Sequence, residues 1–165
     1  KEYFKIIELK TGALFAVAAQ LGARISQASD EIQLQLKEFG LKIGTAYQIY
    51  DDCIDLVGDE TNTGKTLGTD LEKGKLTLPL LNLISSGTEA QKEKLNQRIL
   101  LKEPIDTNAL AGIADYDGAI ERALETGMSL LTESRELLSP LNESSYKTGL
   151  IEITNYLEKL FTDCI

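Results

Sequence analysis

The sequence predicts an all-α protein, on the basis of its composition and the spacing of its apolar residues. The 165 residues include only three prolines and no tryptophan, so few residues interrupt helices. Leucine, alanine, glutamate and lysine, which favour helices, are frequent, whereas runs of β-branched residues are scarce. Apolar residues make up 42% of the chain, which is sufficient for one domain with a sizeable core.

The first third of the chain is expected to form two long helices. The first covers about residues 3–26, where the segment TGALFAVAAQLGA is rich in small residues that allow close helix contact. Ser29 or Asp30 can cap the second helix, which is expected to end near Gly58. Its apolar stripe has helical spacing and comprises Ile32, Leu36, Phe39, Ile43, Tyr47, Tyr50, Ile54 and Val57.

A glycine-rich loop and two shorter helices are expected next. The loop covers about residues 58–75 and contains four glycines. Pro79 can begin a helix over LPLLNLIS, because proline is tolerated in the first turn. Thr88 and Gln91 form a capping-box pattern that begins a further helix over EAQKEKLNQRIL.

The last part of the chain is predicted to hold two helices after a break at Pro104. An amphipathic pattern runs from about Asp117 to Leu138 and is stopped by Pro140. Asn142 is the expected cap of a final helix through TGLIEITNYLEKLF. No internal repeat or low-complexity linker divides the chain.

The charge of the chain excludes several classes of partner. A net charge of −9 and a pI near 4.6 disfavour nucleic acid, which requires a basic face, and anionic membrane surfaces. An anionic substrate would therefore need help from a divalent cation. No apolar run is expected to span a bilayer, and the first residues lack a signal-peptide pattern.

The cysteine and histidine content limits the chemistry. Cys53 and Cys164 form neither a disulfide framework nor a metal-ligand pair, so both are expected to be free thiols in a reducing compartment. The chain has no histidine, which excludes mechanisms that require imidazole. It opens in a helical pattern without an initiating Met, which is expected of the interior of a longer protein.

A cluster of carboxylates ends the second predicted helix. Asp51, Asp52 and Asp55 have the spacing DDxxD, and Gln48 lies one turn earlier. At 100° per residue, Gln48, Asp51 and Asp55 fall within an arc of roughly 60°, with Asp52 at its edge. Gly44 leaves space beside Gln48. Neighbouring carboxylates raise one another's pKa unless a cation lies among them.

Lysines on the following loop indicate a ligand that carries negative charge. Lys65, Lys73 and Lys75 lie among the glycines, and lysine binds phosphate as a point charge. Mg²⁺ is usually held by one or two carboxylates together with phosphate oxygens and water. A diphosphate bridged through Mg²⁺ to Asp51 and held by lysines would explain why negative aspartates and positive lysines occur together in this stretch.

This stretch has two other interpretations. A solvated acidic helix end with a polar loop explains a bare DDxxD, although acidic residues at a helix C-terminus oppose the helix dipole. The segment GDETNTGKT is similar to a phosphate-binding P-loop, but five residues separate Gly58 from Gly64, where that motif has four. The segment also follows a helix instead of a strand, so the P-loop interpretation is disfavoured.

In combination, these motifs resemble the trans-isoprenyl diphosphate synthases, or polyprenyl synthetases. The matching residues are Lys10-Thr11, the Gln48 and DDxxD group, and GKTLGTDLEKGKLTLPLL. The segment YDGAIERALETGMSLLTESRELLSPL is also similar to the penultimate helices of this family. The resemblance covers nearly the whole chain. It implies an isoprenoid-synthase-type helical bundle around a central cavity, usually in a homodimer, and a cytoplasmic enzyme.

The resemblance also implies a reaction and roles for single residues. Members condense isopentenyl diphosphate head-to-tail with an allylic diphosphate, in the presence of Mg²⁺. Thr11 and Gln48 would turn oxygen dipoles toward the developing allylic cation. By the same resemblance, Asp51, Asp52 and Asp55 are the metal site, Lys10, Thr11, Gln48 and Lys65 the catalytic residues, and Lys10, Lys65 and Lys75 the diphosphate-binding residues.

The chain departs from the family pattern in one respect. It has no second DDxxD and no pair of adjacent arginines, both of which the family carries early in its sequence. Residues 1–165 are therefore expected to form the C-terminal half of one synthase domain, inactive until it joins an N-terminal half. A non-catalytic regulatory subunit and a terpene cyclase half are the alternatives, and product length is not specified by these residues.

Overall fold

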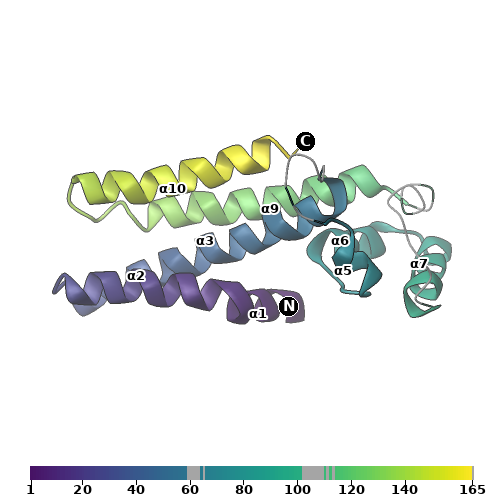
Figure 1. The fold of residues 1–165 in the computed structure, drawn as a ribbon, viewed down its shortest axis with the longest axis horizontal. Coiled ribbons are helices and arrows are strands. Elements are labelled where there is room, and N and C mark those ends of the chain that lie inside the picture. Colours follow the sequence, from purple (N-terminus) through teal and green to yellow (C-terminus); the bar gives the residue numbers. More distant parts are fainter. Residues whose placement is uncertain (59–63, 65, 102–109, 111, 113, 165) are drawn as a thin grey trace. The chain divides into compact units, whose positions relative to one another are not determined.

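Every regular element in the described part of the chain is a helix (Figure 1). The computed structural model describes residues 1–58, 64, 66–101, 110, 112 and 114–164. The expected all-α class is therefore confirmed. In chain order the elements are α1 (Glu2–Ile7), the π-helix η1 (Glu8–Gly12), α2 (Ala13–Ile25), α3 (Asp30–Val57), α5 (Thr69–Glu72), α6 (Leu78–Ser86), α7 (Glu89–Leu101), α9 (Tyr116–Glu136) and α10 (Ser145–Thr162).

The chain forms two compact units whose boundaries fall inside α3 and α9. The first unit contains Lys1–Tyr50 and Thr126–Asp163, and the second contains Asp51–Glu125 together with Cys164. Helices α1, η1, α2 and α10 belong to the first unit, and α5, α6 and α7 belong to the second. The residues predicted to act in the site are thus divided between the two units.

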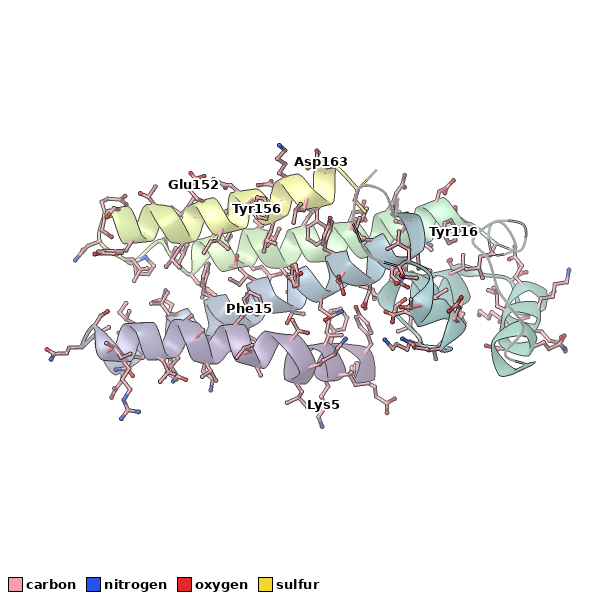
Figure 2. All side chains as sticks on the ribbon, viewed as in Figure 1. Lys5, Phe15, Tyr116, Glu152, Tyr156 and Asp163 are labelled. Carbon is pink, nitrogen blue, oxygen red and sulfur yellow. The ribbon has the colours of Figure 1, made fainter. Side chains whose placement is uncertain are left out.

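Glycines let α2 pack against α3 at close range within the first unit. A Cβ atom at Gly40 would lie 2.3 Å from the backbone oxygen of Phe15, and one at Gly44 would lie 2.9 Å from the Cα of Gly12. Figure 2 shows Phe15 on the side of α2 that faces α3, whereas Lys5 of α1 points away from α3. The close helix contact predicted from the small residues is confirmed.

The buried face of α3 is broader than the predicted apolar stripe. Phe39 and Ile43 are buried as predicted, and Ala46 and Ile49 are buried as well. The other residues of the predicted stripe are only half-buried: Ile32, Leu36, Tyr47, Tyr50, Ile54 and Val57. The prediction followed a single face of the helix. In the first unit α3 is contacted by α2 on one side, and the ring of its Tyr50 also packs against Phe161 of α10. A helix covered on more than one side buries residues outside a single stripe.

Side-chain caps begin two of the long helices. The Oγ of Ser29 accepts a hydrogen bond from the backbone N–H of Ile32 at 3.4 Å, so the predicted cap of α3 is confirmed. The prediction for the last helix is wrong, because Ser144 caps α10 in place of Asn142. The Oγ of Ser144 accepts from the N–H of Lys147 at 3.2 Å, which places the helix start two residues later.

Polar contacts join α9 to α10 in the first unit. The Nε of Arg135 donates to the Oγ1 of Thr154 at 3.0 Å, and the guanidinium also pairs with Glu158. Thr154 is fully buried. The absence of a side chain at Gly127 makes room for the ring of Phe161, which a Cβ atom would meet at 2.2 Å. These contacts hold the last helix in place.

In the second unit, the predicted helix starts are confirmed. Pro79 lies in the first turn of α6. The N–H of Thr88 donates to Oε1 of Gln91 at 2.7 Å, and the N–H of Gln91 donates back to Oγ1 of Thr88 at 3.4 Å. This reciprocal pair is the predicted capping box of α7. Pro104 lies outside the described residues.

One helical stretch is long and apolar enough to cross a membrane, by length and composition alone. It covers Glu2–Ile25 and its most apolar window has a mean hydropathy of 1.3, with 22% of the window buried. Length and composition alone do not show a membrane span. The expectation that no apolar run spans a bilayer concerned uninterrupted runs, whereas this stretch contains charged residues.

Candidate functional site

A π-helix carries the first two residues predicted to act in catalysis. Lys10 and Thr11 lie in η1, between the α-helical segments α1 and α2. A π-helical turn contains one extra residue and is often found at functional sites. Periodicity alone predicted one uninterrupted α-helix here, so the sequence analysis missed this feature. Lys10 is exposed, and Thr11 is half-buried.

Thr11 forms a hydrogen bond with Gln48 of α3. The hydroxyl of Thr11 donates to Oε1 of Gln48 at 2.6 Å. Gln48 is 5% exposed, so its amide lies inside the first unit. The structure therefore brings together two of the predicted catalytic residues, although 37 positions separate them in the chain.

Glycine packing makes this hydrogen bond possible. A Cβ atom at Gly12 would lie 3.0 Å from Oγ1 of Thr45 and 3.2 Å from the backbone oxygen of Leu41. Gly12 follows Thr11 directly, and Thr45 lies one turn before Gln48. The space that Gly44 was predicted to leave is filled by η1 and α2, which approach α3 there.

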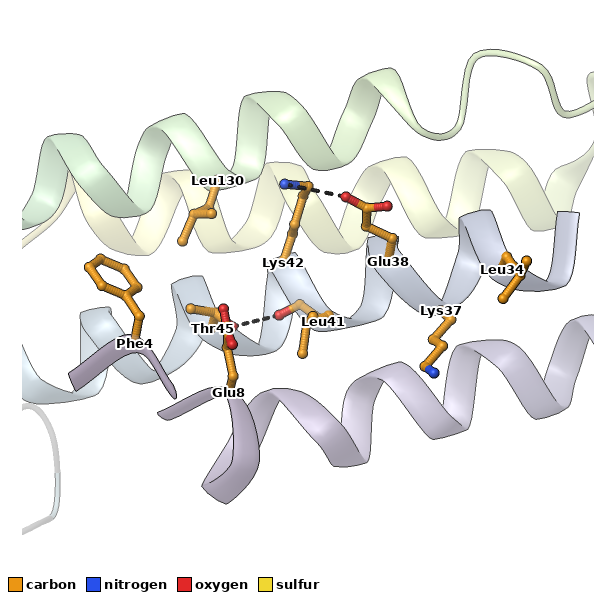
Figure 3. A pocket seen from close by; sticks show the side chains of 9 residues that line it. All are labelled: Phe4, Glu8, Leu34, Lys37, Glu38, Leu41, Lys42, Thr45 and Leu130. Carbon is orange, nitrogen blue, oxygen red and sulfur yellow. Dashed lines mark hydrogen bonds and ion pairs between the residues drawn. The ribbon is translucent and has the colours of Figure 1, made fainter. Parts of the chain in front are cut away.

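A groove of about 440 Å³ runs along α3 in the first unit (Figure 3). It lies on the exposed side of α3, and Figure 3 shows Phe4 of α1 and Leu130 of α9 at the same end of it. Its wall is mainly apolar, with charged side chains at intervals. The lining residues are Phe4, Glu8, Leu34, Lys37, Glu38, Leu41, Lys42, Thr45 and Leu130.

The three predicted metal ligands occupy the last turns of α3, in the second unit. Asp52 is 4% exposed, whereas Asp51 and Asp55 are half-buried. Asp55 is bound to the start of α5: its Oδ2 accepts from the N–H of Asp70 at 2.9 Å, and its Oδ1 accepts from the hydroxyl of Thr69 at 3.4 Å. Asp55 therefore acts as a cap for α5.

A lysine lies close to these aspartates. The ammonium of Lys75 pairs with the carboxylate of Asp70. This hydrogen bond raises the pKa of Lys75, desolvation lowers it to a lesser extent, and the charges of Asp70, Asp52 and Asp55 add smaller increases. The sequence analysis did not identify Asp70 as a site residue, although it lies within the quoted segment GTDL. It links Asp55, through its backbone, to Lys75, through its side chain.

The remaining predicted residues are not assembled in the described part of the structure. Lys65 lies outside the described residues, and Lys73 is exposed in the turn after α5. Among the residues that the structure describes, no group of three acidic, cysteine or histidine side chains converges as a metal centre. The structure thus places the three aspartates on one helix end without gathering all of them around one point.

Tyr116 is a further contact of this helix end that the sequence did not indicate. Its hydroxyl donates to the backbone oxygen of Leu56 at 3.1 Å, across 60 positions. Burial, followed by the charge of Asp117 and by Cys53, raises the pKa of Tyr116 to about 12. Burial also raises the pKa of the Cys53 thiol, with smaller contributions from Cys164 and Asp52. Cys53 is therefore an unreactive thiol, and both cysteines are free as predicted.

Comparison with known proteins identifies the family. The sequence model of the polyprenyl synthetase family matches residues 1–116. A geranylgeranyl diphosphate synthase of Methanosarcina mazei is 33% identical over 156 residues, which are 94% of this chain and 47% of that protein.

Solved structures agree with this assignment. A decaprenyl diphosphate synthase from Rhodobacter capsulatus matches with a TM-score of 0.84 and 26% identity, over 95% of this chain and 49% of that one. A polyprenyl synthase from Caulobacter crescentus, solved with calcium and isoprenyl diphosphate, matches with a TM-score of 0.82 and 26% identity, over 94% and 48%. The chain spans about half the length of the relatives it matches. It therefore belongs to the polyprenyl synthetase family and has the all-α isoprenoid synthase fold of that family.

Proposed function

We propose that this chain forms part of a Mg²⁺-dependent synthase that condenses isopentenyl diphosphate with an allylic diphosphate. The observation that carries the proposal is the contact chain Asp55–Asp70–Lys75 beside the DDxxD aspartates. It keeps a positive charge next to carboxylates at the end of α3. A diphosphate with a bound cation requires both, since carboxylates hold the cation and lysine binds phosphate oxygens.

The side chains in the second unit fit Mg²⁺ as ligands. Mg²⁺ binds oxygen and often takes only one or two protein carboxylates, with water and phosphate completing its shell. Asp51 is the direct ligand in this proposal, as the resemblance to the family implies, and Asp52 and Asp55 support it. When bound, the ion neutralises the charge that develops on the departing diphosphate.

The residues of the first unit act on the allylic carbon. In this reaction the C–O bond of the allylic diphosphate breaks, the alkene of isopentenyl diphosphate supplies the electron pair of the new C–C bond, and a proton leaves. Because the Thr11 hydroxyl donates its proton to Gln48, the lone pairs of its oxygen are available to face the cation. Lys10 binds the departing diphosphate, together with Lys65 and Lys75.

The groove in the first unit supports an apolar substrate tail. Most of its lining surface is apolar, although four of the nine lining side chains are charged, and the groove passes Thr45, one turn before Gln48. The Caulobacter relative was solved with calcium and isoprenyl diphosphate. A divalent cation and a prenyl diphosphate in a relative support the same ligand classes here. The matched relatives make products from geranylgeranyl to decaprenyl diphosphate, so the proposal concerns the reaction and not a chain length.

The proposed enzyme requires more than this chain. The relatives contain about as much sequence again, so we propose that the other half supplies the second wall of the site. Without it the chain would bind diphosphate and not turn over. A homodimer of the completed synthase in the cytoplasm is part of the same proposal, consistent with two free cysteines in the chain.

A binding measurement on the chain itself tests the proposal. Inorganic pyrophosphate is titrated into the chain by calorimetry, with Mg²⁺ and then with EDTA. We expect binding that requires Mg²⁺ and is weakened at least about tenfold by Asp51→Asn, because a neutral amide is a poor ligand for Mg²⁺. Asp30→Asn, at the opposite end of the same helix, is the matched control and leaves the affinity unchanged.

Turnover is then measured with the completed enzyme. The chain is fused in place of the matched region of the Methanosarcina relative and assayed with geranyl diphosphate and labelled isopentenyl diphosphate. A longer prenyl diphosphate, lost on Asp51→Asn and retained on Asp30→Asn, is the expected product. Pyrophosphate binding that ignores both EDTA and Asp51→Asn would contradict the metal assignment. A folded fusion that forms no product would contradict the proposed reaction.

A further inference from the structure

The first helical stretch exposes a continuous row of apolar side chains on the surface of the first unit. Their exposed fractions range from 48% to 80%, which is high for residues of this type. They lie three or four positions apart within each α-helical part and five apart across the π-helix. This row, the apolar seam, consists of Ile6, Leu9, Leu14, Val17, Leu21 and Ile25.

The π-helix keeps the seam on one face. In a straight α-helix, a step of five residues between Leu9 and Leu14 would rotate the row by roughly 140°. The π-helix η1 spans residues 8–12 and absorbs the extra residue. The opposite, buried face shows the same step, between Ile7 and Gly12. Both faces therefore remain continuous, and the buried one consists of Tyr3, Ile7, Gly12, Ala16 and Ala23.

The surface beside the seam has room for a second helix. Ala18 and Gly22 are exposed and lie one turn apart in α2. A Cβ atom at Gly22 would meet nothing within 4 Å. Small residues next to large apolar ones form the holes into which side chains of a neighbouring helix fit. The seam runs over 20 positions, from Ile6 to Ile25, and its ends are roughly 28 Å apart, the length of a helix of about 20 residues.

We infer that the apolar seam is the docking surface for a helix from the other half of the synthase. The chain spans about half of its relatives, so each relative has a comparable length of chain outside the match. Their fold is all-α, so the covering element is a helix. This inference rests on the proposed function, because it identifies where the proposed second half attaches to this one.

The packing of this stretch argues against a membrane as the occupant. Gly12 and Phe15 contact the glycines of α3 so closely that a Cβ atom at Gly40 or Gly44 would clash. The helix is thus already one member of a bundle, and a bilayer would have to strip it from α3. Only the face of this helix that carries the seam remains available for contact with another partner.

The test measures assembly instead of turnover. The chain is co-expressed with a tagged polypeptide comprising the part of the Methanosarcina synthase outside the match, and the amount recovered on the tag is measured. We expect the chain and the tagged polypeptide to be recovered in equal amounts. Leu14→Lys places a charge on the seam, and Gly22→Leu fills the space beside it. Each change is expected to lower recovery at least tenfold.

Two control variants introduce the same residue types, leucine and lysine, on α10 of the same unit. Gly149→Leu introduces leucine at an exposed helical glycine where a Cβ atom also meets nothing within 4 Å. Tyr156→Lys introduces lysine at an exposed aromatic residue, 63% exposed. Both are expected to leave recovery unchanged. Because Leu14 and Gly22 are exposed, none of the four changes removes a core contact, and circular dichroism checks that each variant stays helical.

Each outcome decides the inference. Equal recovery of seam and control variants overturns it, as does no recovery of the unchanged chain. A chain that forms its own dimer, dispersed by Leu14→Lys, assigns the seam to a second copy. Flotation with phosphatidylcholine vesicles, abolished by the same change, assigns it to a membrane. Assembly through the seam without product formation contradicts the proposed function alone, whereas product formation that ignores the seam variants contradicts this inference alone.

Discussion

Thr11 donates its hydroxyl proton to Gln48 over 2.6 Å, which joins the π-helix η1 to the middle of α3. Both residues were predicted to turn oxygen toward an allylic cation. The hydrogen bond orients both groups in advance: Gln48 holds the hydroxyl by its proton and leaves the oxygen lone pairs directed elsewhere. Orientation before binding is what makes such dipoles useful to a developing charge, because no reorganisation is then needed.

This hydrogen bond should be measurable as a coupling between the two residues. We expect Thr11→Val and Gln48→Leu each to lower the free energy of unfolding, and the double variant to lose about 1 kcal/mol less than the sum. The reason is that either single change leaves a polar group without its partner. Urea unfolding of the four proteins measures the coupling. Strict additivity would contradict a hydrogen bond of this kind.

Glycine packing predicts opposite effects for two similar substitutions. Gly40→Ala places a Cβ atom 2.3 Å from the backbone oxygen of Phe15, so the helices must separate, at a cost of roughly 1–3 kcal/mol. Gly149→Ala adds the same atom in open space on α10 and should stabilise the protein by up to about 1 kcal/mol, through helix propensity. Thermal unfolding compares the two. A shift in the same direction for both would contradict the described packing.

Two buried threonines should respond differently to the loss of their hydroxyl. Thr154 donates to the backbone oxygen of Ile151 at 2.7 Å and accepts from Arg135. Thr154→Val should therefore cost about 1–3 kcal/mol, since it leaves the Nε–H of Arg135 without its acceptor. The hydroxyl of Thr77 has no hydrogen-bond partner in the described part of the chain. Thr77→Val should be neutral or stabilising in the same unfolding assay, and a large loss there would reveal a missing partner.

The raised pKa of Tyr116 predicts that the protein becomes less stable at alkaline pH. Its pKa is raised from 10 to about 12 in the folded protein, chiefly by burial. Between these values the unfolded chain loses the proton while the folded chain keeps it, so rising pH favours unfolding. This contribution to stability is present below about pH 10 and is lost as the pH rises toward about 12.

The alkaline effect is isolated by comparing variants. Tyr116→Phe should reduce the dependence of unfolding free energy on pH in this window, because phenylalanine does not titrate. Tyr146→Phe is the matched control, since Tyr146 is 86% exposed. If the two variants titrate alike, the raised pKa of Tyr116 is not a property of the folded state.

Local patterns in the sequence were sufficient for most of the helices. The Thr88–Gln91 box, the cap at Ser29 and the start at Pro79 depend on residues within one turn of each other, so the sequence contains the whole cause. The cap of α10 was predicted at Asn142 but lies at Ser144, because both residue types cap helices well and only the path of the chain selects one.

The candidate site was predictable in its residue types and not in its contacts. The DDxxD, its Gln48 and the lysines follow from spacing and from resemblance to the family. The capping of α5 by Asp55, and the pairing of Asp70 with Lys75, depend on how the segment after α3 folds back. Nothing in the spacing of these residues indicates these contacts.

The all-α class, most helix starts and the chemistry of the acidic and basic residues follow from the sequence alone, because they depend on neighbours along the chain. Only the tertiary structure decided that η1 is a π-helix, that Thr11 reaches Gln48, and that one face of α1 and α2 is buried while the other is exposed. The physical reason is distance along the chain. These features arise where glycine-bearing helices approach each other closely. The packing energy of such an approach depends on residues that are tens of positions apart in the chain.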